Sequence, residues 1–197
     1  MTPDRPQTLT RADLITGLRE LLAELRTAGT GARIRIVGGA AIALTLQAER
    51  PATVDIDGPL EPAAPVLDAA RRVAGRHGWR TDWINDAAAA FIPTGYGDRT
   101  AEWTTVYDDH QVLVQIASPE TLLAMKLHAA QRRGNRDARD LAVLLPHCGI
   151  ATTDDAEQLY EDYYPGDALT PRTLQLVDQI LAAAPTTPST PPPPDLS

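Results

Sequence analysis

The sequence has only one cysteine and lacks a long apolar run. The first feature argues against a disulfide-bonded protein, and the second argues against a membrane-spanning one. Cys148 has no second cysteine with which to form an intramolecular disulfide, so nothing favours an oxidising compartment. No window approaches the roughly 20 apolar residues that a membrane-spanning helix requires, and the N-terminus lacks the apolar segment of a signal peptide. The sequence therefore predicts a cytoplasmic protein without a membrane partner.

Positive charge is also scarce. The chain carries 18 Lys and Arg against 26 Asp and Glu, a formal net charge of -8. A protein that coats nucleic acid needs clustered basic side chains, so a broad surface of that kind is not expected. The exception is a local patch in which five basic residues fall within fourteen positions: Lys126, Arg132, Arg133, Arg136 and Arg139.

The length of 197 residues fits one ordinary domain with a core large enough to fold unaided. The expected order of elements is strand, helix, strand, helix, hairpin and then helices. This order predicts an α/β (α+β) fold, with a small mixed β-sheet flanked by helices. We expect a core over residues 1–117, a C-terminal helical part over 118–184 and a disordered, Pro-rich tail over 185–197.

Apolar spacing and helix caps predict the individual elements. Thr10 and Asp13 form a variant of the capping box, and Ser118 followed by Pro119 is a strong helix start. Strands are expected over 33–37 and 53–57 and at Phe91-Ile92, with a hairpin over 103–107 and 111–117. Helices are expected over 10–28, 40–48, 65–77, 118–133, 136–145, 154–163 and 171–183.

A pair of glycines stands where the first strand turns into a helix. Gly38 and Gly39 would let the backbone approach a phosphate, and the helix N-terminus offers unpaired N–H donors. The structural alternative is a glycine pair that serves the turn alone.

Two aspartates follow on the next strand. The Asp-Ile-Asp run places the carboxylates of Asp55 and Asp57 on one face of a strand, where they repel unless a cation lies between them. A hard divalent ion such as Mg²⁺, held jointly with substrate phosphates, resolves this repulsion. The alternative is two solvated acids at the end of a strand.

The run from Ile36 to Asp57, I-V-G-G-A-A-I-A-L-T-L-Q-A-E-R-P-A-T-V-D-I-D, resembles the first motif of polymerase-β-like nucleotidyltransferases. It is most similar to the branch that contains AbiEii-type and MenT-type toxins. The resemblance implies that Gly38 and Gly39 receive the triphosphate and that Asp55 and Asp57 bind the activating metal, Mg²⁺ or Mn²⁺. Arg50 and Thr53 match an R-x-T-like lead-in before the acids.

A second stretch, from Ser118 to Leu145, resembles the later motif of the same branch, in which a Lys-Leu helix precedes Arg-Asp-x-x-Asp. The resemblance implies that Lys126 contacts nucleotide phosphate and that Arg136 takes part in nucleotide binding. Asp137 or Asp140 would act near the nucleotide or hold the basic side chains in place. The structural alternative for the arginines is a surface ion-pair network, for example Arg136 with Asp140.

One position departs from the family pattern. Where the polymerase-β-like pattern has a third carboxylate, the candidate strand carries Gln115, a poor substitute for a charged metal ligand. Glu102, Asp108 or Asp109 could compensate. Otherwise the protein uses a reduced metal site, or it binds nucleotide without catalysis.

Three further groups of residues are assigned no chemistry. His77, His110, His128 and His147 lack the spacing of metal ligands, and Cys148 lacks an evident base partner. Tyr160, Tyr163 and Tyr164 are spaced as a helix packing face rather than as a base-stacking surface.

The leading hypothesis is a metal-dependent nucleotidyltransferase that moves an NMP from an NTP to an acceptor. The resemblance implies that the acceptor is a tRNA or a protein, that the protein is a toxin and that it has a cognate antitoxin. The alternative is a catalytically impaired nucleotide-binding or interaction module. A third hypothesis, a small-molecule transferase of the aminoglycoside type, requires an acidic cleft, which the basic patch opposes.

Overall fold

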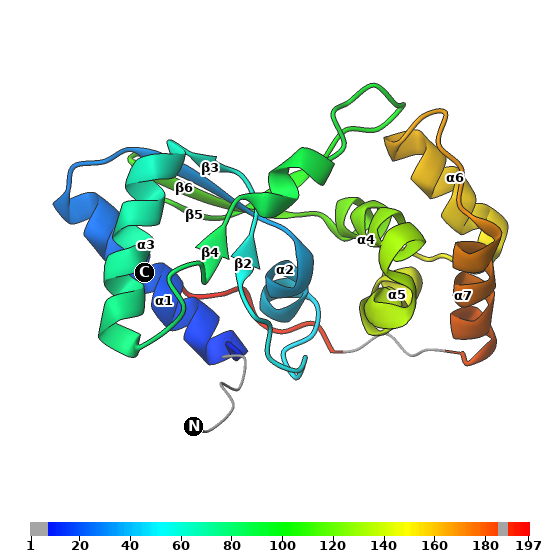
Figure 1. Ribbon diagram of the computed structural model, residues 1–197, viewed down its shortest axis with the longest axis horizontal. Coiled ribbons are helices and arrows are strands. Elements are labelled where there is room, and N and C mark those ends of the chain that lie inside the picture. The colour runs from blue at the N-terminus through cyan, green and yellow to red at the C-terminus, as the bar shows by residue number, and fades with distance from the viewer. Residues whose placement is uncertain (1–7, 185–188) are drawn as a thin grey trace. The chain divides into compact units, whose positions relative to one another are not determined.

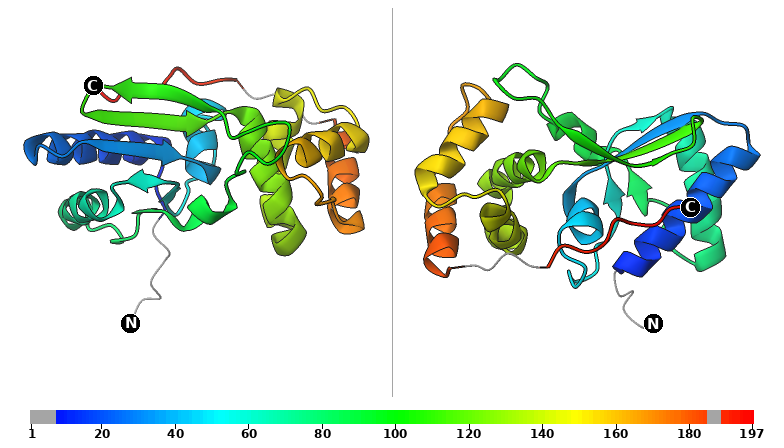
Figure 2. Two further views of the ribbon diagram at one scale, coloured as in Figure 1. Left: turned by 90° about the horizontal axis from the view of Figure 1, so that it is seen from above. Right: turned by 180° about the vertical axis from the view of Figure 1, so that it is seen from behind.

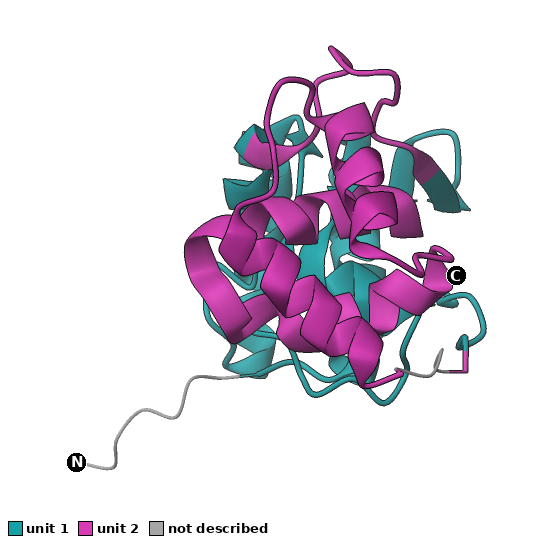
Figure 3. Cartoon of the chain, turned by 90° about the vertical axis from the view of Figure 1, so that its right-hand side faces the viewer, with its two compact units in different colours: residues 1–90, 104–116, 190–197 teal, residues 91–103, 117–189 magenta. Residues whose placement is uncertain are grey.

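The computed structural model describes residues 8–184 and 189–197, whose contacts divide into two compact units. Unit 1 comprises residues 1–90, 104–116 and 190–197, and unit 2 comprises residues 91–103 and 117–189 (Figure 3). Both units are discontinuous in sequence because the hairpin at 104–116 returns to unit 1. The predicted division of the chain at residue 117 stays a prediction.

Unit 1 is built on a four-stranded mixed sheet in the order β3-β1-β6-β5 (Figure 1). The central strand β1 (Ala32–Ile36) pairs in parallel with β6 (Val112–Ala117) and antiparallel with β3 (Leu60–Glu61). The edge strand β5 (Trp103–Asp108) precedes β6, so the predicted hairpin is present. A separate parallel pair joins β2 (Ile56–Asp57) to β4 (Ile84–Asn85). The predicted α/β class with a small mixed sheet is confirmed.

Three helices complete unit 1. Helix α1 (Arg11–Thr27) starts at the predicted Thr10–Asp13 capping box and buries five leucines, and it packs against α2 (Gly38–Thr45) and α3 (Ala63–His77). Figure 2 gives two further views of this arrangement. The side chain of Trp83 is fully buried and donates its indole N–H to the carbonyl of Ala70 at 2.9 Å, which holds α3 beside β4.

Two predicted strands differ in the structure. The strand expected over 53–57 is regular only at Ile56 and Asp57, because Thr53 instead forms an isolated bridge with Leu9. Val54 is 43% exposed whereas Ile56 is 1% exposed, so of these two apolar residues only Ile56 is buried in the core. The strand expected at Phe91-Ile92 is wrong, since Phe91 ends the 3₁₀-helix η1 (Ala87–Phe91).

Unit 2 is largely helical. Helix α4 (Pro119–Arg133) begins at the predicted Ser118 cap, whose hydroxyl accepts from the N–H of Thr121, and it packs against the other helices of the unit. These are η2 (Gly134–Asp137), α5 (Ala138–His147), α6 (Thr153–Tyr163) and α7 (Pro171–Ala182). The helix expected to stop before Pro146 continues to His147, with the proline in its last turn.

Part of the segment expected to be a disordered tail is packed on unit 1. The carbonyl of Pro192 accepts from Arg11 at 2.7 Å, Asp195 pairs with Arg19 at 2.5 Å, and Leu196 is 2% exposed. Proline has a fixed φ and loses little backbone entropy on ordering, so a few contacts suffice to hold such a segment. Residues 185–188 of the expected tail lie outside the described residues.

Among residues 8–184 and 189–197, no helix is both long and apolar enough to cross a bilayer.

Candidate nucleotide and metal site

The predicted glycine turn forms the first turn of α2. The structure starts this helix at Gly38, two residues before the expected start at Ala40. Gly38 has a φ of +68°, which favours glycine, and the preceding Val37 is extended and provides no side-chain cap. The first N–H groups of a helix have no partner within it, so this turn can donate hydrogen bonds to an anion.

Arg50 lies over this turn. A Cβ atom added to Gly39 would lie 2.7 Å from an Nη atom of Arg50 and 3.0 Å from its Cζ atom. The absence of a side chain at Gly39 therefore lets a guanidinium approach the helix N-terminus. The sequence motif contained Arg50, but only the return of the chain after α2 places its charge at the glycine turn.

Asp57 lies beside the same turn. Its carbonyl accepts from the N–H of Val37 at 2.9 Å, and Val37 directly precedes Gly38. The next residue, Gly58, has a φ of +148°, and a Cβ there would lie 2.0 Å from the carbonyl oxygen of Arg35. Gly58 thus permits the close approach of β2 to β1 that brings Asp57 to the glycine turn.

Replacing Gly58 with alanine is expected to lower the free energy of unfolding by about 2–3 kcal/mol, because the new methyl group meets rigid backbone at a strained φ. Urea denaturation followed by circular dichroism measures this change. Gly75→Ala is the matched control, since a Cβ at this helical position meets nothing within 4 Å and should slightly stabilise the protein. An equal stability of the Gly58→Ala variant and the wild type would contradict the steric argument.

Asp55 precedes β2 and is half-buried. Its Oδ2 accepts from the Asn85 amide at 3.2 Å. Burial raises the pKa of the Asp55 carboxyl above its ordinary value; this effect exceeds that of the Asn85 hydrogen bond, and Asp82 adds to the rise while Arg80 opposes it. A bound cation would stabilise the charged form of Asp55, which burial disfavours. Asn85 was not identified from the sequence, because only the β2–β4 pairing brings it to Asp57 and Asp55.

Gln115 occupies the expected third-carboxylate position opposite Arg35 in the parallel register of β1 and β6. Its amide oxygen accepts from Arg35 Nε at 3.3 Å. Asp108 and Asp109 cannot replace the missing acid because they lie at the wrong end of the sheet. They precede β6 at its first residue, Val112, which pairs with Ala32 at the start of β1. The glycine turn follows the opposite end of β1, about five residues or 16 Å away along the strand.

The residues present fit an ion that is shared with a substrate. In the described part of the chain, no group of three His, Cys, Asp or Glu side chains could hold a metal by itself. Mg²⁺ commonly takes one or two carboxylates and completes its coordination with water and substrate phosphates. Asp57, whose backbone pairs with Val37 beside the glycine turn, and Asp55, two residues earlier, suit that mode. A closed metal site made by the protein alone does not fit.

In unit 2, Lys126 is held by two buried carboxylates. Its Nζ lies 2.7 Å from Asp137 Oδ1 and 2.8 Å from Asp140 Oδ2, and the three side chains are 15%, 6% and 7% exposed. Lys126 is therefore a largely buried lysine whose charge is neutralised by two acids of the second motif. An ammonium has three N–H donors, so these two contacts leave one for a ligand.

The ion pair suggested for Arg136 and Asp140 is wrong. Arg136 lies in η2 with an exposed side chain and forms no ion pair within the described residues, whereas Asp140 pairs with Lys126. The Asp137 Oδ2 atom is buried and accepts no hydrogen bond in this part of the chain. The acids of the second motif therefore hold the lysine, and the arginines remain available to solvent.

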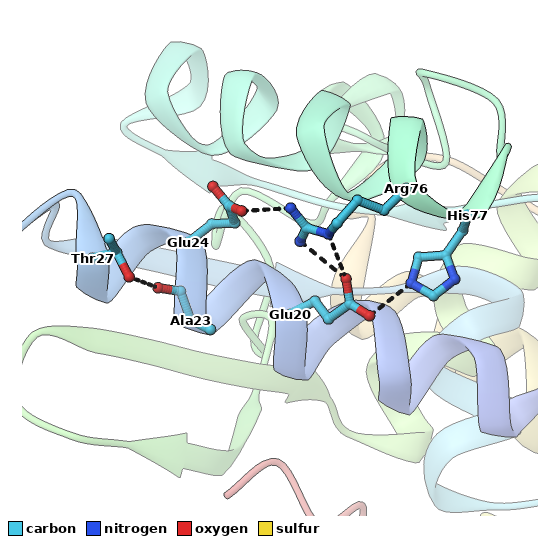
Figure 4. A pocket seen from close by; sticks show the side chains of 6 residues that line it. All are labelled: Glu20, Ala23, Glu24, Thr27, Arg76 and His77. Carbon is cyan, nitrogen blue, oxygen red and sulfur yellow. Dashed lines mark hydrogen bonds and ion pairs between the residues drawn. The ribbon is translucent and has the colours of Figure 1, made fainter.

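A pocket on α1 and α3 has a different character (Figure 4). Glu20 contacts both Arg76 at 3.0 Å and His77 at 2.7 Å, and Glu24 contacts Arg76 at 2.6 Å. These exposed ion pairs join the two helices and contribute little stability individually. The pocket contains none of the residues of the two sequence motifs.

The four-stranded mixed sheet with helices packed on it defines an α/β protein. A family model described as "Nucleotidyl transferase AbiEii toxin, Type IV TA system" matches residues 89–190, slightly more than half of the chain. The chain belongs to the AbiEii family, as the resemblance implied, and membership indicates a nucleotidyltransferase toxin of a type IV toxin–antitoxin system.

The matched residues include Lys126, Arg136, Asp137 and Asp140, whereas the motif from Gly38 to Asp57 precedes them. Neither the curated proteins nor the solved structures contain a match to this chain.

Proposed function

We propose that this protein is a metal-dependent nucleotidyltransferase toxin that transfers an NMP from an NTP to an acceptor hydroxyl in the cytoplasm. The observation that carries the proposal is the backbone pairing of Val37 with Asp57, which joins the glycine turn to the acidic strand within unit 1. Family membership supports the reaction class.

In this proposal, the N–H groups at Gly38 and Gly39 bind the β- and γ-phosphates, and the Arg50 guanidinium neutralises part of their charge. Asp55 and Asp57 hold Mg²⁺ or Mn²⁺ together with the phosphates. When bound, such an ion stabilises the charge that develops on the phosphate oxygens during transfer. Asn85 orients the Asp55 carboxylate through its amide.

The second motif has a supporting role in nucleotide binding. The family motif implies that Lys126 contacts a nucleotide phosphate, and Asp137 and Asp140 fix the orientation of its ammonium. Arg136, which is exposed, supplies a further positive charge for the nucleotide. The acceptor is a tRNA or a protein, and a cognate antitoxin restrains the activity.

A second candidate function is a nucleotide-binding module without transferase activity. Gln115 favours it, because the neutral amide and the adjacent Arg35 leave the site with two acids. Both candidate functions predict nucleotide binding, but only the transferase predicts turnover of the NTP.

Calorimetric titration with each NTP, with Mg²⁺, with Mn²⁺ and without metal, tests the proposal. Metal-dependent binding of one NTP by the wild type, lost in the Asp55→Ala, Asp57→Ala double variant, is the expected result. The control variant Asp154→Ala, Glu161→Ala removes the same charge from exposed positions of α6 and should bind normally. No binding of any NTP would overturn the proposal, and binding without turnover on tRNA or protein acceptors would favour the second candidate.

A further inference from the structure

Residues 190–197, hereafter the proline segment, lie beside helix α1 in unit 1 and are red in Figure 2. An Nη atom of Arg11 donates to the Pro192 carbonyl at 2.7 Å, and Arg19 pairs with Asp195 at 2.5 Å. Three residues of a polyproline II helix span about 9 Å and eight residues of an α-helix about 12 Å, so the two distances are similar. The segment therefore follows α1 in the same direction and is bound along a face of the helix.

The proline segment turns one side toward unit 1. Pro191 and Pro194 are buried, whereas Pro192 and Pro193 are exposed. Consecutive prolines have a fixed φ and hold each preceding residue in an extended conformation, which favours a polyproline II helix with three residues per turn. The burial repeats every three residues, and Leu196, which is 2% exposed, extends the contact. A surface that buries this side recognises the pattern Pro-x-x-Pro-Asp-Leu.

One of the two cations that hold the segment is also held by unit 1. The same Nη atom of Arg11 donates to the carbonyl of Leu44 at 3.3 Å, in the last turn of α2. The Arg11 guanidinium is thus oriented by the fold as well as by the segment. A ligand that binds an oriented side chain loses less conformational entropy on binding.

The proline segment satisfies these two arginines incompletely. The Nε atoms of Arg11 and Arg19 are both buried and have no hydrogen-bond acceptor among residues 8–184 and 189–197. A buried donor without an acceptor is costly, so a ligand that supplies further oxygens has an advantage. The pair between Arg19 and Asp195 is 41% and 68% exposed, and such pairs contribute little. The segment is therefore a ligand that a better one can displace.

We propose that the face of α1 between Arg11 and Arg19, hereafter the proline groove, binds an acidic polyproline II segment of another protein. The partner shares the pattern Pro-x-x-Pro-Asp-Leu and offers further carboxylate oxygens to the two guanidiniums. The proline segment is its intramolecular competitor, with an effective concentration on the order of 1 mM because it belongs to the same chain. The inference concerns the outer face of α1 and does not depend on the proposed function.

Fluorescence anisotropy with a labelled peptide of residues 189–197, without NTP or metal, tests the inference. The full-chain variant Asp195→Lys, Leu196→Ser weakens the resident segment and vacates the groove. It should bind the peptide at least about tenfold more tightly than the wild type, in which the segment competes. Circular dichroism checks that this variant is folded.

Arginine substitutions in the vacated variant locate the peptide. Adding Arg11→Gln, Arg19→Gln should weaken binding about tenfold, because hydrogen bonds to charged groups are lost. The matched control adds Arg33→Gln, Arg71→Gln, which removes two exposed arginines that pair with Glu61 and Asp68. The control should bind as the vacated variant does.

Peptide substitutions test the pattern at constant composition. Replacing Pro191 and Pro194 with alanine removes the two buried rings and should weaken binding about tenfold. Replacing Pro192 and Pro193 with alanine removes the two exposed rings and should have little effect. A peptide with Pro192→Glu, which offers a carboxylate beside Arg11, should bind about threefold more tightly.

Asp195→Lys alone changes an exposed side chain and serves as the second vacated variant if the double variant unfolds. No peptide binding by either variant, binding that ignores Arg11 and Arg19, or equal losses from the two alanine peptides would each overturn the inference. Equal or weaker binding of the Pro192→Glu peptide would overturn the acidic partner. Wild-type dimers that Asp195→Lys abolishes would assign the groove to a second copy and overturn the partner assignment.

Discussion

Replacing Asp55 or Asp57 with asparagine is expected to reduce nucleotide transfer at least a hundredfold while leaving the protein folded. Each substitution preserves side-chain volume and removes one of the two negative charges proposed to share the metal. Labelled-NTP transfer to tRNA and protein acceptors measures the loss. Asp154→Asn, at an exposed position of α6, is the control. A variant that retains full activity would exclude that carboxylate from metal binding.

Asp55→Asn should also raise the melting temperature, and the sign follows from the raised pKa of Asp55. The native state binds the Asp55 carboxyl proton more tightly than the unfolded state does. The free energy of unfolding therefore falls as pH rises from the ordinary Asp pKa of 3.8 through the raised pKa of Asp55 in the native state. The gain from Asp55→Asn should be full at pH 7.5 and small near pH 3.5. Lower stability of the variant at pH 7.5 would show that the carboxylate is structurally required.

Replacing Lys126 with methionine is expected to lower the free energy of unfolding by about 3–5 kcal/mol, because it leaves the carboxylates of Asp137 and Asp140 buried without their cation. Chemical denaturation measures the loss. The triple variant Lys126→Met, Asp137→Asn, Asp140→Asn should recover much of the stability, since it removes the uncompensated charges. Transfer activity should stay low in both variants, which separates the proposed phosphate contact from the structural role.

Lys126 is the only lysine of the chain, which permits a direct measurement of its environment. Reductive ¹³C-methylation labels this side chain alone, apart from the terminal amine. An ammonium held by two buried carboxylates should react slowly in the folded protein and quickly in urea. Fast methylation under native conditions would contradict the ion-paired geometry.

The features that the sequence determined are local ones. The caps at Thr10 and Ser118 and the hairpin before α4 each depend on a few adjacent residues. The N–H groups at a helix start are capped by a side chain within three residues. A helix cap can therefore be recognised from the sequence without knowledge of the rest of the fold. The second motif, which lies within the residues matched to the AbiEii family, was recognisable for the same reason.

Features that depend on distant segments were decided only by the tertiary structure. The strand expected over 53–57 was shortened by the bridge between Thr53 and Leu9, and the segment at Phe91 became a 3₁₀-helix with an exposed ring. The approaches of Arg50 to Gly39 and of Arg172 to Gly134 depend on how the chain folds back on itself. Such folding back produces no periodic pattern in the sequence from which it could be predicted. Short-range spacing determines caps, helices and motif order, whereas the placement of charges against one another is set by packing between segments far apart in sequence.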